Sequence, residues 1–309
     1  MISLLLLAGL LSSSSVALSS NTSLVCAIDM GSNSFKLIVG EMKEGNYVQH
    51  HFEKTRLGVG DDMSKTGVIS PPKLKEIRET LEKYLAVCDS KGILTRSAVA
   101  TAAFREAKNQ ADVVEIAKSL NLPLEIVSEE RESQLAYLVG ALEKQNFAVI
   151  DNGSRTIELV TRAASGYQWS VFNLGYRIAF QRFFEPARTF AEADGAYRQV
   201  LAPHLLSAGF MKNRDGYAGV EMEDVARYLL SQDRVDGVFI SLDTVSRKIA
   251  ALRAMSEIEF SQLKKVKNID EILPRLVLLE QTLITFGYQE IQVFGRELGV
   301  GLIVENGVN

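Results

Sequence analysis

Two short segments of the chain carry the same residues around an aspartate and a glycine. Residues 27–37 (AIDMGSNSFKL) recur as residues 149–159 (VIDNGSRTIEL), with Ile, Asp, Gly, Ser and Leu coinciding at an offset of 122 positions. Each copy follows a short apolar run and precedes a β-rich one, at 35–42 and 157–163, so the unit is a strand, a turn and a second strand. The repeat predicts a duplicated domain with a cleft between its halves.

Both turns have the residue types that bind phosphate. Glycine lets the backbone approach a ligand closely, and the N–H groups and hydroxyls of such a turn can cradle phosphate oxygens. The candidate phosphate ligands are Gly31, Ser32, Asn33, Ser34, Gly153, Ser154, Arg155 and Thr156. Asp29 and Asp151 are candidate ligands of Mg²⁺, which prefers hard oxygen donors. A plain hairpin is the alternative for either turn alone, and the second copy favours phosphate binding.

Two charged side chains are expected near the same cleft. Arg105 follows a predicted strand at its carboxyl end, where open α/β folds gather ligands, and arginine is suited to phosphate. Glu132 lies one turn into a helix that Ser128 caps, where its side chain could point into the cleft. A solvated arginine at a helix start is the alternative for Arg105. The preceding Glu129 and Glu130 are explained by the helix dipole.

The elements that would hold these residues alternate in the α/β manner. Helices are predicted from Ser70 to about Cys88, over 112–120, and from Ser128 to about Gln145, where the helix links the domains. Strands are predicted at 95–100, 124–127, 237–241 and 290–294. The second half is expected to be more helical, with helices over 191–201, 223–231, 244–254 and 269–287, and Pro203 is expected to end or kink the first of these.

These elements predict an N-terminal domain over 24–140 with the first phosphate loop and a C-terminal domain over 146–309 with the second. No linker is rich in Pro, Gly or Ser, so the domains should pack closely around a hinge. With 47% hydrophobic residues and a net charge of −4, the chain is an ordinary globular protein. Neither nucleic-acid nor membrane-surface binding is expected as its main role, and a homodimer is left open.

The cysteines and histidines do not predict a metal centre or a disulfide framework. Cys26 and Cys88 lie outside any C-x-x-C spacing, and Cys26, inside an apolar run, is expected to be a small core residue. The adjacent His50 and His51 would point to opposite faces of a strand, and His204 is distant.

Residues 1–20 are expected to be a signal peptide. An apolar run over 2–11 precedes four serines and the triplet Ser15-Val16-Ala17, which is the pattern of an h-region and a cleavage site, too short for a membrane span. No Lys or Arg precedes Lys36, so the usual basic region is missing. We therefore expect an exported, periplasmic protein that starts near Leu18 and does not span the membrane when mature. The alternative is a mis-assigned start of a cytoplasmic protein.

The chain resembles the Ppx/GppA phosphatases, which comprise exopolyphosphatases and guanosine pentaphosphate phosphohydrolases. AIDMGSNSFKLIV is the most specific match, and RLGVG, ATAAFREA, EIVSEERESQLAYLVG and VIDNGSRTIEL follow in the family's order, over about residues 25–176. The resemblance implies two actin-like (ribonuclease H-like) domains that flank a cleft. It further implies that Glu132 is the catalytic base, that Asp151 and Gly153 belong to the metal and phosphate loop, and that Arg105 contacts the substrate.

The chain departs from the family pattern in three places. The family's second loop is Asp-x-Gly-Gly-Gly-Ser-Thr. In this chain, Ser154-Arg155-Thr156-Ile157 stand where the family has Gly-Gly-Ser-Thr. A later Gly-x-Gly-Thr loop is matched to Ser241-Leu242-Asp243-Thr244, and the C-terminal Leu-Arg-Glu-Gly to 298–301, without its arginine. Arg155 either adds a contact to an anion or fills the phosphate pocket.

The expected function is hydrolysis of the terminal phosphoanhydride of inorganic polyphosphate or a nucleoside polyphosphate such as guanosine pentaphosphate. Mg²⁺ is the expected cofactor, and Glu132, Asp151 and Arg105 are the expected catalytic residues. The main alternative is a catalytically impaired member of the same fold that binds or senses an anion, which the altered loops favour. A sugar or acetate kinase on this fold is a third class, against which the 241–244 segment argues.

Overall fold

The computed structural model describes residues 24–142, 144, 146–233 and 235–308. The predicted signal peptide at 1–20 lies outside this part of the chain. Within the described residues, no helix combines the length and the apolar character needed to cross a membrane.

The first domain is built on a five-stranded sheet in the order β3-β2-β1-β4-β5. β1 pairs antiparallel with β2 and parallel with β4. The strands are β1 Val25–Met30, β2 Ser34–Lys43, β3 Asn46–Arg56, β4 Thr95–Ala100 and β5 Leu124–Ile126. The helices are α1 Val59–Met63, α2 Pro71–Ser90, α3 Ala102–Glu106 and α4 Gln110–Ser119. Ser70 caps α2 as predicted, because its side chain accepts a bond from the N–H of Lys73.

The second domain repeats this topology in a six-stranded sheet, β10-β11-β9-β6-β7-β8. β6 takes the place of β1, antiparallel to β7 and parallel to β9. The strands are β6 Phe147–Asn152, β7 Ile157–Ala163, β8 Gly166–Phe172, β9 Gly216–Val220, β10 Val238–Ser241 and β11 Glu290–Val293. The helices are α6 Tyr176–Ala179, α7 Phe190–Ser207, α8 Glu223–Leu230, α9 Leu242–Arg253, α10 Glu257–Leu263 and α11 Ile269–Phe286. The predicted duplication is therefore present in the fold.

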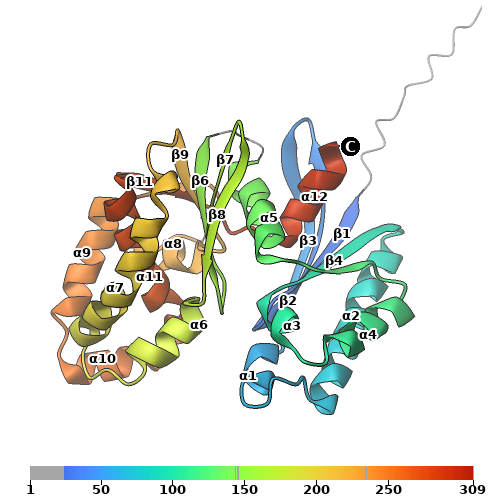
Figure 1. Ribbon diagram of the computed structural model, residues 1–309, viewed down its shortest axis with the longest axis horizontal. Coiled ribbons are helices and arrows are strands. Elements are labelled where there is room, and N and C mark those ends of the chain that lie inside the picture. Colours follow the sequence, from blue (N-terminus) through green and yellow to red (C-terminus); the bar gives the residue numbers. More distant parts are fainter. Residues whose placement is uncertain (1–23, 143, 145, 234, 309) are drawn as a thin grey trace, which may run out of the picture.

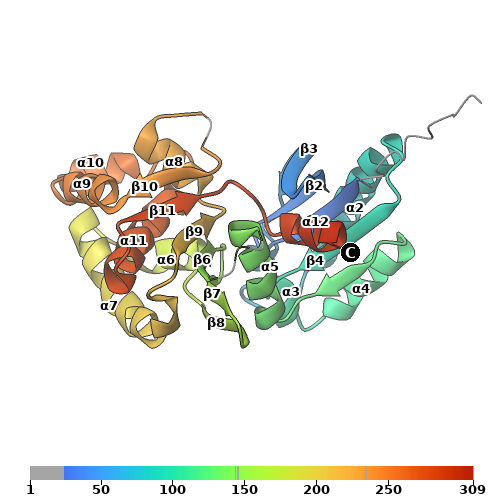
Figure 2. The same cartoon turned by 90° about the horizontal axis from the view of Figure 1, so that it is seen from above.

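Two helices lie between the sheets, as Figures 1 and 2 both show. α5 (Glu129–Ala141) packs on β6 and β7 of the second sheet, and α12 (Gly299–Val308) packs on α5 and on β1 and β2 of the first sheet. The chain expected to stay in the second domain through residue 309 thus crosses back to the first. The domains are joined at two places, which fits the expected close packing around a hinge.

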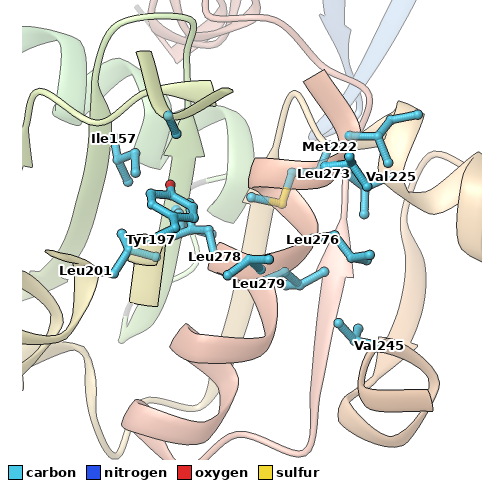
Figure 3. Packing of buried hydrophobic residues seen from close by; sticks show 14 of the residues in the cluster. Ile157, Tyr197, Leu201, Met222, Val225, Val245, Leu273, Leu276, Leu278 and Leu279 are labelled. Atoms are coloured by element: carbon cyan, nitrogen blue, oxygen red, sulfur yellow. The ribbon is translucent and has the colours of Figure 1, made fainter. Parts of the chain in front are cut away.

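The side chains of the strands that lead into the phosphate loops point alternately into two hydrophobic cores. In β1, Cys26 and Ile28 belong to the core under α2 and α4, whereas Val25 and Ala27 belong to the core between the domains. Because side chains alternate along a strand, Asp29 faces the other domain, and the same alternation in β6 turns Asp151 toward the first domain. The outer face of the second sheet packs on α7 and α11, where Tyr197, Leu201, Leu276 and Leu279 are fully buried (Figure 3).

Several local predictions need correction. α7 continues to Ser207 with Pro203 inside it, so this proline does not end the helix. The linker helix stops earlier than expected, at Ala141, where Leu142 takes a left-handed conformation. β3, β8, β9 and the short helices were not predicted, since their patterns of apolar residues are short or irregular.

The largest correction concerns the cysteines, which form a disulfide between Cys26 of β1 and Cys88 of α2. Both residues are fully buried, so Cys26 is a core residue as predicted, but it is not a free thiol. The bond joins the strand that carries Asp29 to the last turn of α2. Two cysteines 62 positions apart give no spacing signal, and only the fold brings them together.

Candidate active site

The first phosphate loop follows β1 and is held by the residues that begin α1. The carbonyl of Asn33 accepts bonds from the N–H groups of Leu57 and Gly58, and the carbonyl of Ser32 accepts one from Gly60. Gly58 needs its left-handed φ of 61°, which glycine adopts without strain. The motif RLGVG therefore ties down the carbonyls of the first loop, which leaves the other face of the loop toward the cleft.

The second phosphate loop is held in the same way by the start of α6. The N–H groups of Gly175, Tyr176 and Arg177 donate to the carbonyls of Arg155, Gly153 and Ser154. A Cβ on Gly175 would lie 2.4 Å from the carbonyl carbon of Arg155, so this position requires glycine. The two loops are thus pseudo-symmetric in their support as well as in their sequence.

A polar cleft of about 530 Å³ lies between the loops. Every predicted loop residue lines it, together with Asp29, Asp151 and Glu132. Arg105 is the exception among the predicted site residues. The lining residues without a predicted role are Lys36, Lys54, Thr101, Ala102, Tyr176, Glu221, Arg275 and Leu298.

Glu132 is a buried carboxylate that Arg105 holds from behind. An Arg105 Nη1 donates to Glu132 Oε2 at 2.5 Å and to the carbonyl of Val127 at 2.9 Å. Burial raises the pKa of Glu132 to about 7 although Arg105 lowers it. A carboxylate with this pKa can take up a proton near neutral pH. Arg105, expected to contact the substrate, instead positions the candidate base in this structure.

Asp151 lies near the end of β6, opposite Glu158 of β7, a residue without a predicted role. Asp151 Oδ1 and Glu158 Oε1 are buried and have no hydrogen-bond partner among the described residues. Burial, reinforced by nearby carboxylates, raises the pKa of both groups well above the usual range. Orphaned, buried carboxylate oxygens fit a divalent cation such as Mg²⁺, which would supply the missing positive charge. Asp151 therefore suits its predicted role as a metal ligand.

Asp29, the other predicted metal ligand, is engaged by a lysine. Lys36 Nζ lies 3.0 Å from Asp29 Oδ2, 2.7 Å from Glu221 Oε1 and 2.7 Å from Glu297 Oε2. The charges of these three groups outweigh burial and raise the pKa of Lys36 well above its usual range. Lys36 occupies in the first repeat the position of Glu158 in the second. Lys36 and Glu158 are charged residues at the same position of two otherwise apolar strands. This pattern indicates functional side chains, and it was not used in the predictions.

The third loop of the cleft is not the one predicted. Asp243 is exposed, pairs with Arg247 on α9 and does not line the cleft, so the match to 241–244 is wrong. The loop that reaches the cleft follows β9, the parallel neighbour of β6, and carries Glu221. Glu221 has a φ of 55°, a left-handed conformation in which glycine is favoured. A motif search misses this loop because a glutamate replaces the expected glycine.

Cationic side chains of the second domain complete the site. The buried Arg275 of α11 donates twice to the carbonyl of Asn152, and its guanidinium lies 4.2 Å from the ring centre of Tyr176. Arg155 pairs with Glu106 of the first domain. The Tyr176 hydroxyl accepts a bond from Asn33 at 3.1 Å, so the first phosphate loop is connected across the cleft to α6, the helix that supports the second loop. This arrangement combines backbone donors, arginines and buried carboxylates, which are the groups that phosphoryl transfer requires.

Two domains that repeat one sheet topology, with paired loops at the cleft between them, define the general class of the protein. The chain belongs to the Ppx/GppA phosphatase family, whose model matches residues 38–306. The resemblance found in the sequence is confirmed.

Solved structures show the same fold. The crystal structure of the Aquifex aeolicus member of this family superposes with a TM-score of 0.79 at 20% identity, covering 93% of this chain and 98% of that one. A second structure of the Aquifex aeolicus PPX-GPPA enzyme gives 0.78 at 21% identity, covering 92% and 99%. An exopolyphosphatase from Cytophaga hutchinsonii gives 0.70 at 19% identity, covering 92% and 98%.

Proposed function

We propose that this protein hydrolyses the terminal phosphoanhydride bond of inorganic polyphosphate or of a nucleoside polyphosphate such as guanosine pentaphosphate. The observation that carries the proposal is the buried Glu132 carboxylate in the wall of a cleft between two phosphate loops. One of the similar structures is described as an exopolyphosphatase, which supports the same reaction class.

The loops would bind the terminal phosphoryl group from both sides. Ser32 and Ser34 contribute hydroxyls from the first domain, and Ser154 and Thr156 contribute hydroxyls from the second. The carbonyls of both loops are already bonded to α1 and α6, so backbone donors are left for the anion. Such fixed donors stabilise the charge on the phosphoryl oxygens without reorganisation in the transition state.

Glu132 would orient a water molecule and accept its proton. The water oxygen forms a bond to the terminal phosphorus, the bridging P–O bond breaks, and the shortened chain leaves with the bridging oxygen. Asp151, with Glu158 beside it, would hold Mg²⁺, which when bound offsets the negative charge of the phosphates. Arg105 keeps the Glu132 carboxylate in place for this step.

The remainder of the substrate has room on the far side of the loops. A second cavity, of about 370 Å³, is lined by Ser32, Asn33, Ser154 and Arg155, which also line the first, and by Arg177 and Gln181 of the second domain. The two loops therefore form the wall between two chambers. A linear polyanion can extend from one to the other, with Arg155 and Arg177 as its cationic contacts.

The second candidate function is that of an anion-binding or sensing protein that does not cleave its ligand. The altered second loop, in which Ser154 and Arg155 stand where the family pattern has glycines, favours this alternative.

Export is proposed along with the hydrolase function. The buried Cys26–Cys88 disulfide supports an oxidising compartment, where such bonds persist. A periplasmic location would favour polyphosphate over guanosine pentaphosphate, which is a cytoplasmic nucleotide.

The test is phosphate release from long-chain polyphosphate and from guanosine pentaphosphate, with Mg²⁺ and with a chelator. We expect release that depends on Mg²⁺. Tight binding of either anion without any release, at all Mg²⁺ concentrations, would establish the binding function instead.

A further inference from the structure

The Lys36 ammonium joins carboxylates from three parts of the chain. Asp29 lies on β1 of the first domain, Glu221 follows β9 of the second, and Glu297 lies in the segment that crosses from β11 back to α12. Each carboxylate has an oxygen within 3.0 Å of Lys36 Nζ. Lys36, Asp29 and Glu297 are buried and Glu221 is partly buried, with side-chain exposed fractions of 15% or less.

These carboxylates form the ligand set of a hard divalent cation. One oxygen from each of Asp29, Glu221 and Glu297 lies within 4.8 Å of the others, and oxygen ligands of this kind hold Mg²⁺ or Mn²⁺. When they are ionised, three buried carboxylates at this spacing need a positive charge beside them, because an uncompensated buried charge is strongly destabilising. In the described chain, the salt bridges of these three groups lead to one cation, Lys36.

We propose that the Lys36 ammonium is a resident cation that occupies a divalent-metal site and keeps metal ions out of it. Asp29 then forms an ion pair with Lys36 and does not bind Mg²⁺. Any metal ion of the cleft must bind on the Asp151 and Glu158 side. The ammonium also holds Glu221 and Glu297 against β1 and β2, so Lys36 positions the second domain and the crossing segment relative to the first phosphate loop.

Lys54 offers a matched control. It lines the same cleft, on β3, directly opposite Lys36 of β2 in the sheet, and it is exposed. No salt bridge within 4.0 Å is formed by Lys54 in the described structure. Removal of either lysine takes one positive charge from the cleft, but only the removal of Lys36 uncovers the three carboxylates.

The experiment counts Mn²⁺ ions bound per chain, by electron paramagnetic resonance of the free ion, in full-length variants whose folding is checked by circular dichroism. Lys36→Ala should bind one ion more than the wild type, and Lys54→Ala should bind the same number as the wild type. Adding Glu221→Gln to Lys36→Ala should remove the gained ion. A folded Lys36→Ala variant that gains no ion would overturn the proposal.

A second measurement covers the case in which Lys36→Ala does not fold. In the wild-type background, Glu221→Gln should leave the number of bound Mn²⁺ ions unchanged, since Glu221 holds an ammonium and not a metal. Loss of a bound ion in this variant would show that the three carboxylates already bind metal. A wild type that binds no Mn²⁺ would contradict the proposed Mg²⁺ at Asp151 but not the role of Lys36, so the two proposals can fail separately.

Discussion

At the scale of single residues, the pair of Glu132 and Arg105 sets the working pH of the proposed reaction. Burial raises the pKa of Glu132 to about 7, and the Arg105 charge opposes that rise. Arg105→Met removes the opposing charge, so the pKa of Glu132 should rise further. The acidic limb of the profile of kcat against pH should move to higher pH, while Arg105→Lys should move it less. An unchanged limb with a raised KM would show that Arg105 contacts the substrate and does not position the base.

Arg155 is the residue by which this chain differs most clearly from the family's phosphate loop. Its side chain lies between the two chambers and pairs with Glu106. If Arg155 binds the anion, Arg155→Gly should weaken polyphosphate affinity by about 1.5–3 kcal/mol, the range for a hydrogen bond to a charged group. Glu106→Gln, which frees the guanidinium, should strengthen binding. Calorimetric titration at fixed Mg²⁺ measures both, and tighter binding by Arg155→Gly would mean that Arg155 blocks the site.

At the scale of elements, the disulfide ties the strand of the first phosphate loop to α2. Without it, the unfolded chain regains the freedom of a long loop, so the Cys26→Ala, Cys88→Ala double variant should lose about 2–5 kcal/mol of unfolding free energy. Urea denaturation of the oxidised wild type and the variant measures the difference. The wild type unfolded in the presence of a reductant is the control and should match the variant. Equal stabilities of the oxidised wild type and the variant would mean that the bond adds nothing.

The strands and helices near the phosphate loops could be predicted because their signals are local. The strands at 95–100 and 157–163 agree with β4 and β7, and Ser128 caps α5 as expected. The loop with Glu221 and the ion pairs of Lys36 could not be predicted, since they depend on which strands become neighbours and on how the two domains meet. The repeat did single out Lys36 itself, because Lys36 and Glu158 stand at equivalent positions.

At the scale of the whole molecule, ion pairs and hydrogen bonds connect the two domains around the cleft. Arg177 donates to both Asp61 oxygens, at 2.9 and 2.5 Å, and Asn33 bonds to Tyr176. Lys36 pairs with Glu221 in the interior. The structure is therefore a closed form. Substrate entry requires that some of these contacts open, as in domain closure around a ligand.

The buried acids in and beside the cleft should make the stability of the metal-free protein depend on pH. Burial raises the pKa of Glu132 to about 7 and that of Glu297 to about 8, from the ordinary 4.5. Their contribution to stability is full below pH 4.5 and is lost as the pH rises through 7 and 8. Burial tends to raise the pKa of Glu221, but Lys36 lowers it to about 2. The contribution of Glu221 to stability is therefore lost only at acidic pH.

The melting temperature of the metal-free protein should consequently fall between pH 5.5 and pH 8.5. Mg²⁺ at pH 8.5 should restore part of the loss by neutralising Asp151 and Glu158. Differential scanning calorimetry in a chelating buffer and in Mg²⁺ checks both statements. A melting temperature that rises over this interval without metal would show that these acids ionise in the folded protein without lowering its stability.

The most direct test of the proposed function is the rate of phosphate release by Glu132→Gln. Glutamine has nearly the same shape but cannot accept the proton, so release from polyphosphate should fall by about 10²–10⁴-fold, with polyphosphate affinity nearly unchanged. Glu130→Gln, on the exposed first turn of the same helix, should keep the wild-type rate. Full activity of Glu132→Gln would contradict the assignment of the base and, with it, the proposed mechanism.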